Sequence, residues 1–247
     1  MAQIREIKRR IKSINNTSKV THAMELVAAA KMRKSQEQAL ASRPYTNTLN
    51  EILTEVRSKS QKSTHALLTA NTAQSQMLIL LTSDRGLVGG LNINLFREIS
   101  KLQNISLKLV VVGKKGQNFA AKTNSDLISS FISDEFSPIE LARTLTKIAT
   151  EAYKKGDISK VLVLYPDFQS TIKQVPSITQ ILPIEFEKVE EGQTINPSTQ
   201  TELLFEPNPD QILENLLPHY VLTKIYQTLQ EAKASEHSAR MVAMRNA

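Results

Sequence analysis

The segment SDRGLVGGLN, residues 83–92 of this 247-residue chain, places an acid and a base beside three glycines. The charged residues are Asp84 and Arg85, and the glycines are Gly86, Gly89 and Gly90. Glycine-rich turns between a strand and a helix bind phosphate groups, because their backbone N–H groups converge on the anion. The spacing here matches neither GxGxxG nor GxxxxGK[ST]. We therefore expect tight-turn roles for the glycines, and an exposed ion pair or a turn cap for Asp84 and Arg85.

Other residue types that could support catalysis are poorly placed for it. The segment VVGKKGQ, residues 111–117, also follows an apolar run and also lacks a complete phosphate-loop pattern. The four histidines are far apart and include no i,i+4 pair, which argues against a metal site. The sequence has no cysteine and no GxSxG serine. We predict no catalytic residue, no cofactor and no metal, so the chain is not expected to be an enzyme.

The basic charge of the chain is concentrated at its N-terminal end. The formal net charge is +7, and residues 1–40 alone contain nine Lys or Arg against three Glu. Such a segment can bind nucleic acid, an anionic membrane or an acidic protein surface. No aromatic residue precedes Tyr45 to stack on bases, which weighs against nucleic acid. The mixture of Met24, Lys31 and Arg33 also fits a plain coiled-coil seam with a solvated basic face.

The N-terminal segment has the periodicity of one long helix. Ile4, Ile7, Ile11 and Ile14 follow a heptad stripe, and no glycine or proline occurs between residues 3 and 42. We predict a helix over residues 3–57, with a kink at Pro44. At 1.5 Å per residue it would be roughly 80 Å long, so it must project from a globular body.

The middle of the chain alternates apolar runs with helical patterns. The runs are MLILLTS (77–83), LKLVVVG (107–113) and KVLVLYP (160–166). The helical patterns cover 91–103, 115–123 and 138–155. This alternation predicts a Rossmann-like α/β body at residues 77–206, built on a parallel sheet. Pro176 and Pro183 exclude a central strand where they occur, and TELLFEP (201–207) is one further candidate strand.

The helical period returns at residues 209–247. Apolar residues recur every four positions, at Leu213, Leu217, Val221, Ile225 and Leu229, with Pro218 as a possible kink. We predict that this helix pairs antiparallel with the N-terminal one, which gives an α/β fold with a long coiled coil. No helix-stop signal follows Met241, so we expect that the natural chain continues.

Three long segments carry a family resemblance. KSINNTSKVTHAMELVAAAKMRKSQ (12–36) resembles the N-terminal helix signature of the gamma subunit of F-type ATP synthases. LTSDRGLVGGLN (81–92) is similar to the glycine-rich segment of that family, and SEHSARMVAMRNA (235–247) resembles the start of its C-terminal signature. The segments occur in the expected order, and the helix–insert–helix layout covers the whole chain.

The resemblance implies a non-catalytic rotary shaft. In that family the terminal helices thread a hexamer of alpha and beta subunits, while the body contacts the epsilon subunit and the membrane-embedded c-ring. Ion flow turns the ring and the shaft, and an asymmetric shaft changes the nucleotide affinity of each beta subunit in sequence.

The same resemblance assigns residues to the contact with the beta subunits. Met24 matches the position that faces an acidic segment of a beta subunit, and Glu236 and Arg240 match a pair on the opposing helix. Their i,i+4 spacing puts that pair on one helix face. Lys31 and Arg33 belong to the basic face that would meet the acidic beta surface. The segment LLFEP (203–207) is expected near the epsilon and c-ring end.

Two departures from the family pattern lead to further expectations. Family members continue for several helical turns beyond the AMRNA segment, so we expect that the C-terminal tip is missing here. The absence of cysteine excludes the regulatory insertion of chloroplast members, and no transit peptide is visible. Both favour a bacterial source and a place on the cytoplasmic face of the plasma membrane. A Rossmann-type nucleotide-binding enzyme and a basic nucleic-acid binder remain as alternatives, but neither explains the three segments.

Overall fold

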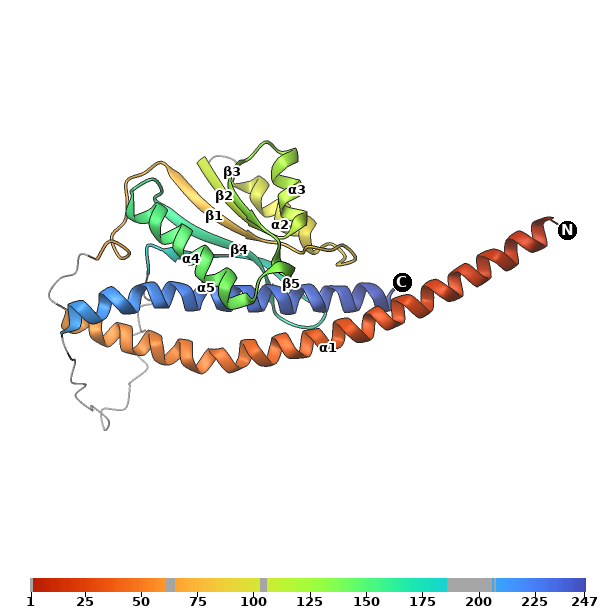
Figure 1. Ribbon diagram of the computed structural model, residues 1–247, viewed down its shortest axis with the longest axis horizontal. Coiled ribbons are helices and arrows are strands. Elements are labelled where there is room, and N and C mark those ends of the chain that lie inside the picture. The colour runs from red at the N-terminus through yellow and green to blue at the C-terminus, as the bar shows by residue number, and fades with distance from the viewer. Residues whose placement is uncertain (1, 61–64, 103–105, 186–205, 207) are drawn as a thin grey trace.

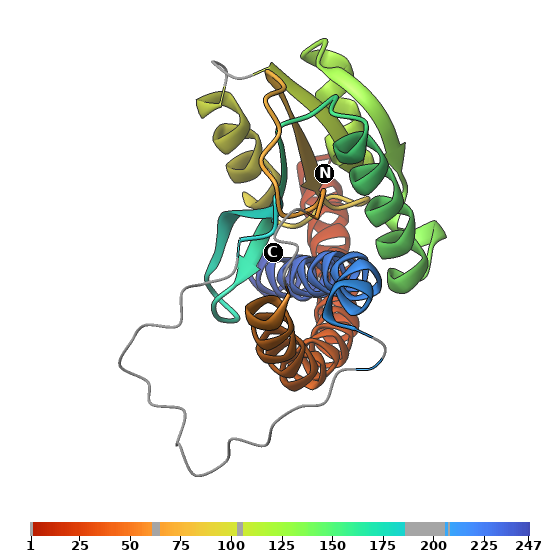
Figure 2. The same ribbon diagram turned by 90° about the vertical axis from the view of Figure 1, so that its left-hand side faces the viewer.

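The computed structural model describes residues 2–60, 65–102, 106–185, 206 and 208–247. Two long helices, α1 (Ala2–Lys59) and α5 (Pro209–Arg245), lie antiparallel, and an α/β body packs on α5 (Figure 1). The N-terminal part of α1 projects beyond the end of α5, as the long-helix prediction required. The view along the helices shows α5 lying between α1 and the body (Figure 2).

The buried face of α1 is a heptad seam that begins well inside the helix. Its buried positions are three or four residues apart, except for one step of seven from Ala39 to Thr46: Ala28, Met32, Ser35, Ala39, Thr46, Leu49, Leu53 and Val56. The isoleucine stripe predicted at Ile4–Ile14 is 53–67% exposed, because it lies on the part of α1 that extends past α5. The seam therefore pairs only about the C-terminal half of α1 with α5.

Both helices continue through their internal prolines. Pro44 of α1 and Pro218 of α5 each remove one backbone donor, yet neither helix is interrupted. The two sites lie opposite each other, because the Tyr45 hydroxyl and His219 Nε2 are 2.6 Å apart. The rings of Tyr45 and His219 also meet edge to face. The two prolines thus lie at one level of the shaft, where the residues that follow them hydrogen-bond across the helix pair.

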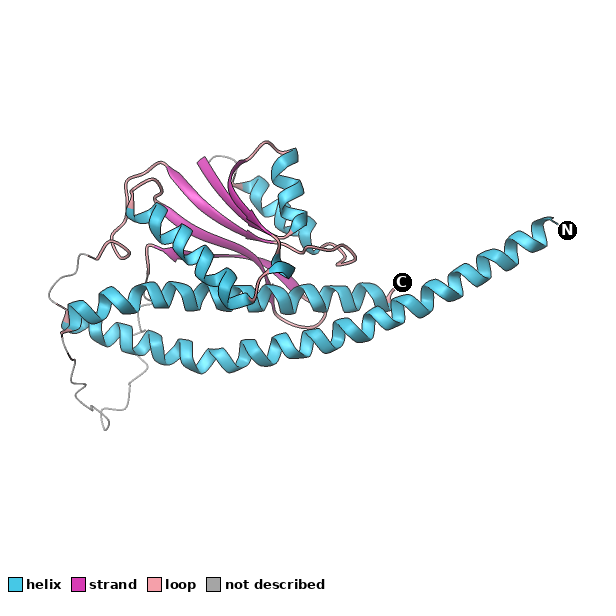
Figure 3. Ribbon diagram, viewed as in Figure 1, coloured by secondary structure: helices cyan, strands magenta, loops and turns pink. Residues whose placement is uncertain are grey.

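The body is a five-stranded sheet in the order β3-β2-β1-β4-β5 (Figure 3). Its strands are β1 (Ser75–Leu81), β2 (Ser106–Val112), β3 (Asp126–Phe131), β4 (Lys160–Phe168) and β5 (Gln174–Leu182). The first four are parallel, and β5 is an antiparallel edge strand that contains Pro176. The predicted α/β fold with a coiled coil is therefore confirmed. The strand β3 was not predicted, because Ser129 and Ser130 interrupt its apolar run.

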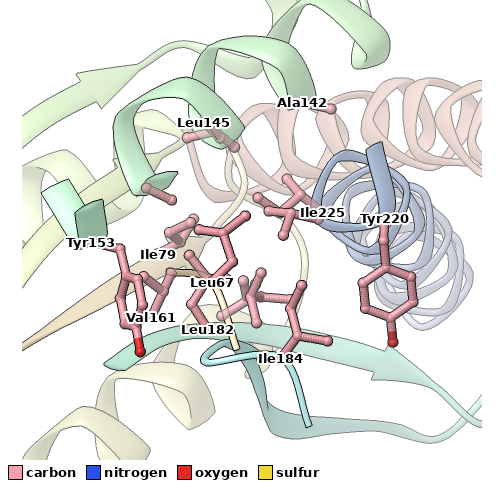
Figure 4. Close-up of a cluster of buried hydrophobic side chains, with 14 of the residues drawn as sticks. Leu67, Ile79, Ala142, Leu145, Tyr153, Val161, Leu182, Ile184, Tyr220 and Ile225 are labelled. Atoms are coloured by element: carbon pink, nitrogen blue, oxygen red, sulfur yellow. The ribbon is translucent and has the colours of Figure 1, made fainter. Parts of the chain in front are cut away.

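Alternate residues of the strands supply two separate cores. Leu78 and Leu80 of β1 face α2 (Leu91–Lys101) and α3 (Lys114–Lys122). Met77, Ile79 and Leu81 face α4 (Pro138–Lys154) and α5. The second core also takes in Leu49, Leu53 and Val56 of α1, so the shaft and the body share one apolar cluster (Figure 4). A strand with two buried faces is what a parallel sheet requires. The segment TELLFEP lies outside the described residues except for Glu206 and offers no test of that expected strand.

Close packing at the carboxyl ends of β1 and β2 depends on two glycines. Gly113 has φ +99°, and a Cβ atom there would lie 2.2 Å from the carbonyl oxygen of Thr82. A Cβ on Gly116 would lie 2.7 Å from a methyl group of Val111 and 2.8 Å from Thr82 Oγ1. The Thr82 hydroxyl donates to the carbonyl of Val112 (2.8 Å) and accepts from the N–H of Gly116 (2.9 Å). The chain can approach this closely only where it lacks side chains.

We predict that Gly113→Ala lowers the free energy of unfolding by roughly 2–4 kcal/mol, because the added methyl group meets backbone atoms that cannot move aside. Gly90→Ala is the matched control, since the nearest atom to its Cβ would be 3.7 Å away and its φ is −84°. That control should cost less than about 1 kcal/mol. Urea unfolding of both variants tests this, and equal losses would contradict the packing argument.

Candidate functional site

The carboxyl ends of the parallel strands face α5 and carry a hub built on Asp84. Its Oδ1 accepts hydrogen bonds from the backbone N–H groups of Lys114 (3.0 Å) and Ser133 (3.3 Å). Its Oδ2 accepts from the N–H of Asp134 (2.8 Å). One carboxylate thus joins the segments that follow β1, β2 and β3. Arg85 is not its partner, because Arg85 pairs with Asp134 at 3.4 Å on the surface.

The Asp84 hub also bears on the question of phosphate binding. The N–H of Lys114 belongs to the first turn of α3, where an anion would otherwise bind. The Asp84 carboxylate fills that position, and its negative charge would repel a phosphate. At this turn the Rossmann-like fold therefore holds its own anion in place of a nucleotide.

The β1–α2 loop, residues 82–90, is closed by its own hydrogen bonds. The backbone N–H of Ser83 donates to Asn92 Oδ1 (3.2 Å), and Asn92 Nδ2 donates to Ser83 Oγ (2.8 Å). Val88 of this loop packs with Leu91 and with Ala239 of α5 in a small buried cluster. The loop thereby joins the sheet edge to the shaft. Of its three glycines, Gly89 alone has a positive φ, of +57°.

The pair Glu236–Arg240 lies on α5 directly beside this edge. Glu236 Oε1 accepts from Arg240 at 2.7 Å, and the side chains are only 19% and 13% exposed. Burial raises the pKa of Glu236 above its ordinary value, although the Arg240 guanidinium acts in the opposite direction. The negative charges of Asp134 and Asp84 add to the upward shift of this pKa. The pair and the Asp84 hub therefore form one electrostatic cluster.

His237 lies in the same cluster and is surrounded by cations. Burial, together with the charges of Arg240, Lys31 and Lys233, lowers the pKa of His237 to about 4, and Asp134 opposes the shift weakly. Its Nδ1 is buried and has no hydrogen-bond partner among the described residues. Because Lys31 acts on His237, this part of α1 lies opposite the same turn of α5. His237 is therefore neutral near pH 7.

The residues singled out in the sequence fall into two groups. Glu236, Arg240, Asp84 and Arg85 come together at the sheet edge, and Lys31 of α1 acts on the neighbouring His237. Met24 is half-buried and Arg33 is exposed on α1, and the described contacts join neither to that cluster. Sequence reasoning missed three further members of the cluster: Asp134, Lys233 and His237. Asp134 reaches the cluster through β3, which the sequence pattern did not predict, whereas Lys233 and His237 lie on α5 within four residues of Glu236.

The described part of the chain offers neither a metal site nor a membrane-spanning helix. It contains no group of three His, Asp or Glu side chains that could hold a metal ion. Within the same residues no helix combines the length and the hydropathy needed to cross a bilayer.

Comparisons with known proteins give a consistent result. A family model described as ATP synthase matches residues 3–247. The ATP synthase gamma chain of Opitutus terrae is 38% identical, and the match covers 100% of this chain and 87% of that one. The protein of the same name from Desulfitobacterium hafniense is 39% identical, with 99% and 85% covered.

Solved structures share the fold at lower sequence identity. A chain from the central stalk and c-ring structure of the Tetrahymena thermophila mitochondrial ATP synthase matches with a TM-score of 0.68 and 24% identity. That match covers 92% of this chain and 98% of the other. A chain from the rotor of the Euglena gracilis mitochondrial ATP synthase matches with a TM-score of 0.66 and 17% identity, covering 99% and 90%.

We predict that Asp84→Asn destabilises the chain by roughly 2–3 kcal/mol, because a neutral amide replaces a charged acceptor of three backbone N–H groups. Asp157→Asn removes the same charge from an exposed side chain with no described hydrogen bond, and should change stability by less than about 0.5 kcal/mol. Urea unfolding measures both. A loss in Asp84→Asn no larger than in the control would show that the hub is dispensable.

His237 should make stability depend on pH. Because its pKa in the folded chain is about 4, below the usual 6.5, its contribution is present above pH 6.5 and is lost as pH falls toward 4. Between pH 7 and 4.5 the wild type should lose roughly 1–2 kcal/mol more than His237→Gln, allowing for partial exposure. Unfolding measured at both pH values checks this, and parallel pH profiles would refute the assignment.

Proposed function

Because this chain belongs to the ATP synthase gamma chain family, we infer that helices α1 and α5 form the rotary shaft of that complex. The observation that carries this is the match over residues 3–247, together with a long helix that projects past its own body. As a gamma chain it is a non-catalytic subunit. It couples rotation to ATP synthesis or hydrolysis in other subunits.

The shape of the molecule supports coupling by asymmetry. The body packs on one side of the helix pair, and α1 lies on the other side of α5 (Figure 2). A shaft of this form presents a different surface to each of several surrounding subunits. Each rotational position therefore favours a different set of conformations around it, which is the differential contact that coupling requires.

The proposed partners follow from the family. The projecting helices enter a hexamer of three alpha and three beta subunits, while the body and the foot of the shaft meet the epsilon subunit and the c-ring. This subunit belongs to the peripheral part of a membrane complex. We place it on the cytoplasmic face of a bacterial plasma membrane. The functional division is an N-terminal helix at 1–57, a body at 77–206 and a C-terminal helix at 209–247.

The proposed contact with the beta subunits centres on Met24. It lies half-buried near the point where α1 leaves the seam, and the exposed cations Lys31 and Arg33 lie roughly two to two and a half turns further along. A basic, partly apolar surface of this kind suits an acidic segment on a beta subunit. Glu236 and Arg240 of the opposing helix belong to the proposed contact by family resemblance alone, because their side chains pair with each other beside the Asp84 hub.

The assignment as a shaft is tested by native mass spectrometry of the chain mixed with alpha and beta subunits of a related bacterial enzyme. One copy of the chain per three alpha and three beta subunits is expected. Failure to assemble, together with binding to duplex DNA that weakens steeply as salt rises, would instead favour a nucleic-acid binder.

We predict that Met24→Lys disturbs coupling more than assembly, because a new cation at this contact changes how strongly each catalytic state binds the shaft. Ion pumping per ATP hydrolysed should fall roughly fivefold or more, while the complex still forms and hydrolyses ATP. Met24→Leu keeps an apolar side chain of similar volume and should remain coupled. Pumping and hydrolysis are measured together in reconstituted vesicles, and a normal ratio in Met24→Lys would rule out this role.

A further inference from the structure

The body holds one turn of α5 from two sides, at Ser238 and Ala239. We propose that this turn is where torque passes between body and shaft, through a collar made of the β4–β5 turn (residues 169–173) and the β1–α2 loop (residues 82–90). The proposal rests on the shaft function and adds to it the residues that lock the rotor together. Ser238 acts in it as a positioning residue.

The β4–β5 turn is held in shape by its own hydrogen bonds, independently of its contact with the shaft. Ser170 and Lys173 exchange backbone hydrogen bonds, with Ser170 N–H donating at 3.0 Å and Lys173 N–H donating at 3.2 Å. Gln174 Nε2 donates to the carbonyls of Ser170 and Thr171, each at 3.0 Å. These bonds fix the direction of the Thr171 carbonyl.

Ser238 binds that fixed carbonyl. Its side chain is fully buried, and its Oγ donates to the carbonyl of Thr171 at 2.7 Å and accepts from Gln174 Nε2 at 3.4 Å. The neighbouring Ile172 is 83% exposed, so the turn is not held against the shaft by burial of its apolar side chain. A directional hydrogen bond therefore attaches the turn to α5.

Ala239 provides the second side of the collar. It is buried against Val88 and Leu91 of the β1–α2 segment, which the Asp84 hub anchors to the sheet. Consecutive residues of a helix point about 100° apart, so Ser238 and Ala239 contact the body in two different directions. Two such contacts at one level resist rotation of α5 about its own axis.

The remaining contact between α5 and the body resists rotation less well. This contact lies in the large apolar cluster, where α5 contributes Leu213, Leu217, Val221, Ile225 and Leu229. The hydrophobic effect that stabilises the cluster is non-directional, so it opposes a rotation of the helix only weakly. The collar lies beyond this cluster, beside Glu236 and Arg240, where the paired helices leave the body (Figure 1). The collar is therefore placed to transmit twist between the body and the part of the shaft that extends beyond it.

The chain offers a matched control for this bond. Ser235 is fully buried on the same helix, but its Oγ has no hydrogen-bond partner among the described residues. Ser238→Ala and Ser235→Ala therefore delete the same buried hydroxyl, and the first alone breaks a bond to the body. Gln174→Ala is a second test variant, which loosens the turn without altering α5.

The experiment makes two measurements on the assembled complex in vesicles. The first is the hydrogen-exchange rate of the Lys173 amide, and the second is ATP-driven ion pumping against an opposing ion gradient that is increased in steps. In Ser238→Ala the amide of Lys173 should exchange hydrogen about fivefold faster, which corresponds to about 1 kcal/mol. Pumping per ATP should fall in Ser238→Ala and in Gln174→Ala, and the loss should grow with the gradient, because a loosened collar yields under torque. Ser235→Ala should match the wild type in both measurements.

Two results would overturn the proposal. Unchanged exchange in both test variants would show that the bond does not hold the turn. Faster exchange with a normal pumping ratio at every gradient would show that torque passes elsewhere. Failure of the wild-type chain to support any pumping would instead count against the shaft function. The collar proposal is tested separately, by the difference between the variants and a wild type that does pump.

Discussion

The structure depends on α5 being buried on two faces at once. One face forms the seam with α1, and the other covers the sheet together with α4, so a single apolar cluster runs from α1 through α5 to β1. A helix buried this widely cannot shift against the sheet without also disturbing the seam. The long α1, which is attached mainly through α5, gains its fixed direction from this arrangement. The shaft and the body consequently behave as one rigid unit, which is what a rotor needs.

The carboxyl edge of the sheet has been adapted to a mechanical role. In a Rossmann-like fold this edge is the usual place for a ligand, since the loops there are free of the sheet. In this chain the Asp84 carboxylate occupies the first turn of α3 and ties three loops together. One of these loops, the β1–α2 loop, packs on Ala239 of α5, and the charges of Asp84 and Asp134 act on Glu236. An edge that binds nucleotides in other proteins here binds the shaft.

Sequence periodicity was enough to predict the elements that are buried uniformly. The buried face of α5, the apolar runs of β1, β2 and β4, and the edge position of Pro176 all follow from local patterns. The seam of α1 does not, because its isoleucine stripe is exposed and small residues such as Ala28 and Ala39 form the buried face instead. The strand β3 was missed because its serines give no clear alternation. The roles of Asp84 and Ser238 were out of reach, since their partners are backbone groups brought near by the topology. The sequence drew attention to Gly86, Gly89 and Gly90, whereas the strictest steric demand falls on Gly113 and Gly116.

The most direct test of the rotor is to observe the body turning. A bead attached through a cysteine introduced at the exposed Asn118 of α3 would be followed by microscopy while immobilised alpha and beta subunits hydrolyse ATP. If the chain is the shaft and the body is locked to it, the bead should rotate in one direction with three equally spaced pauses per turn. A stationary bead on a complex that hydrolyses ATP at its normal rate would contradict this account.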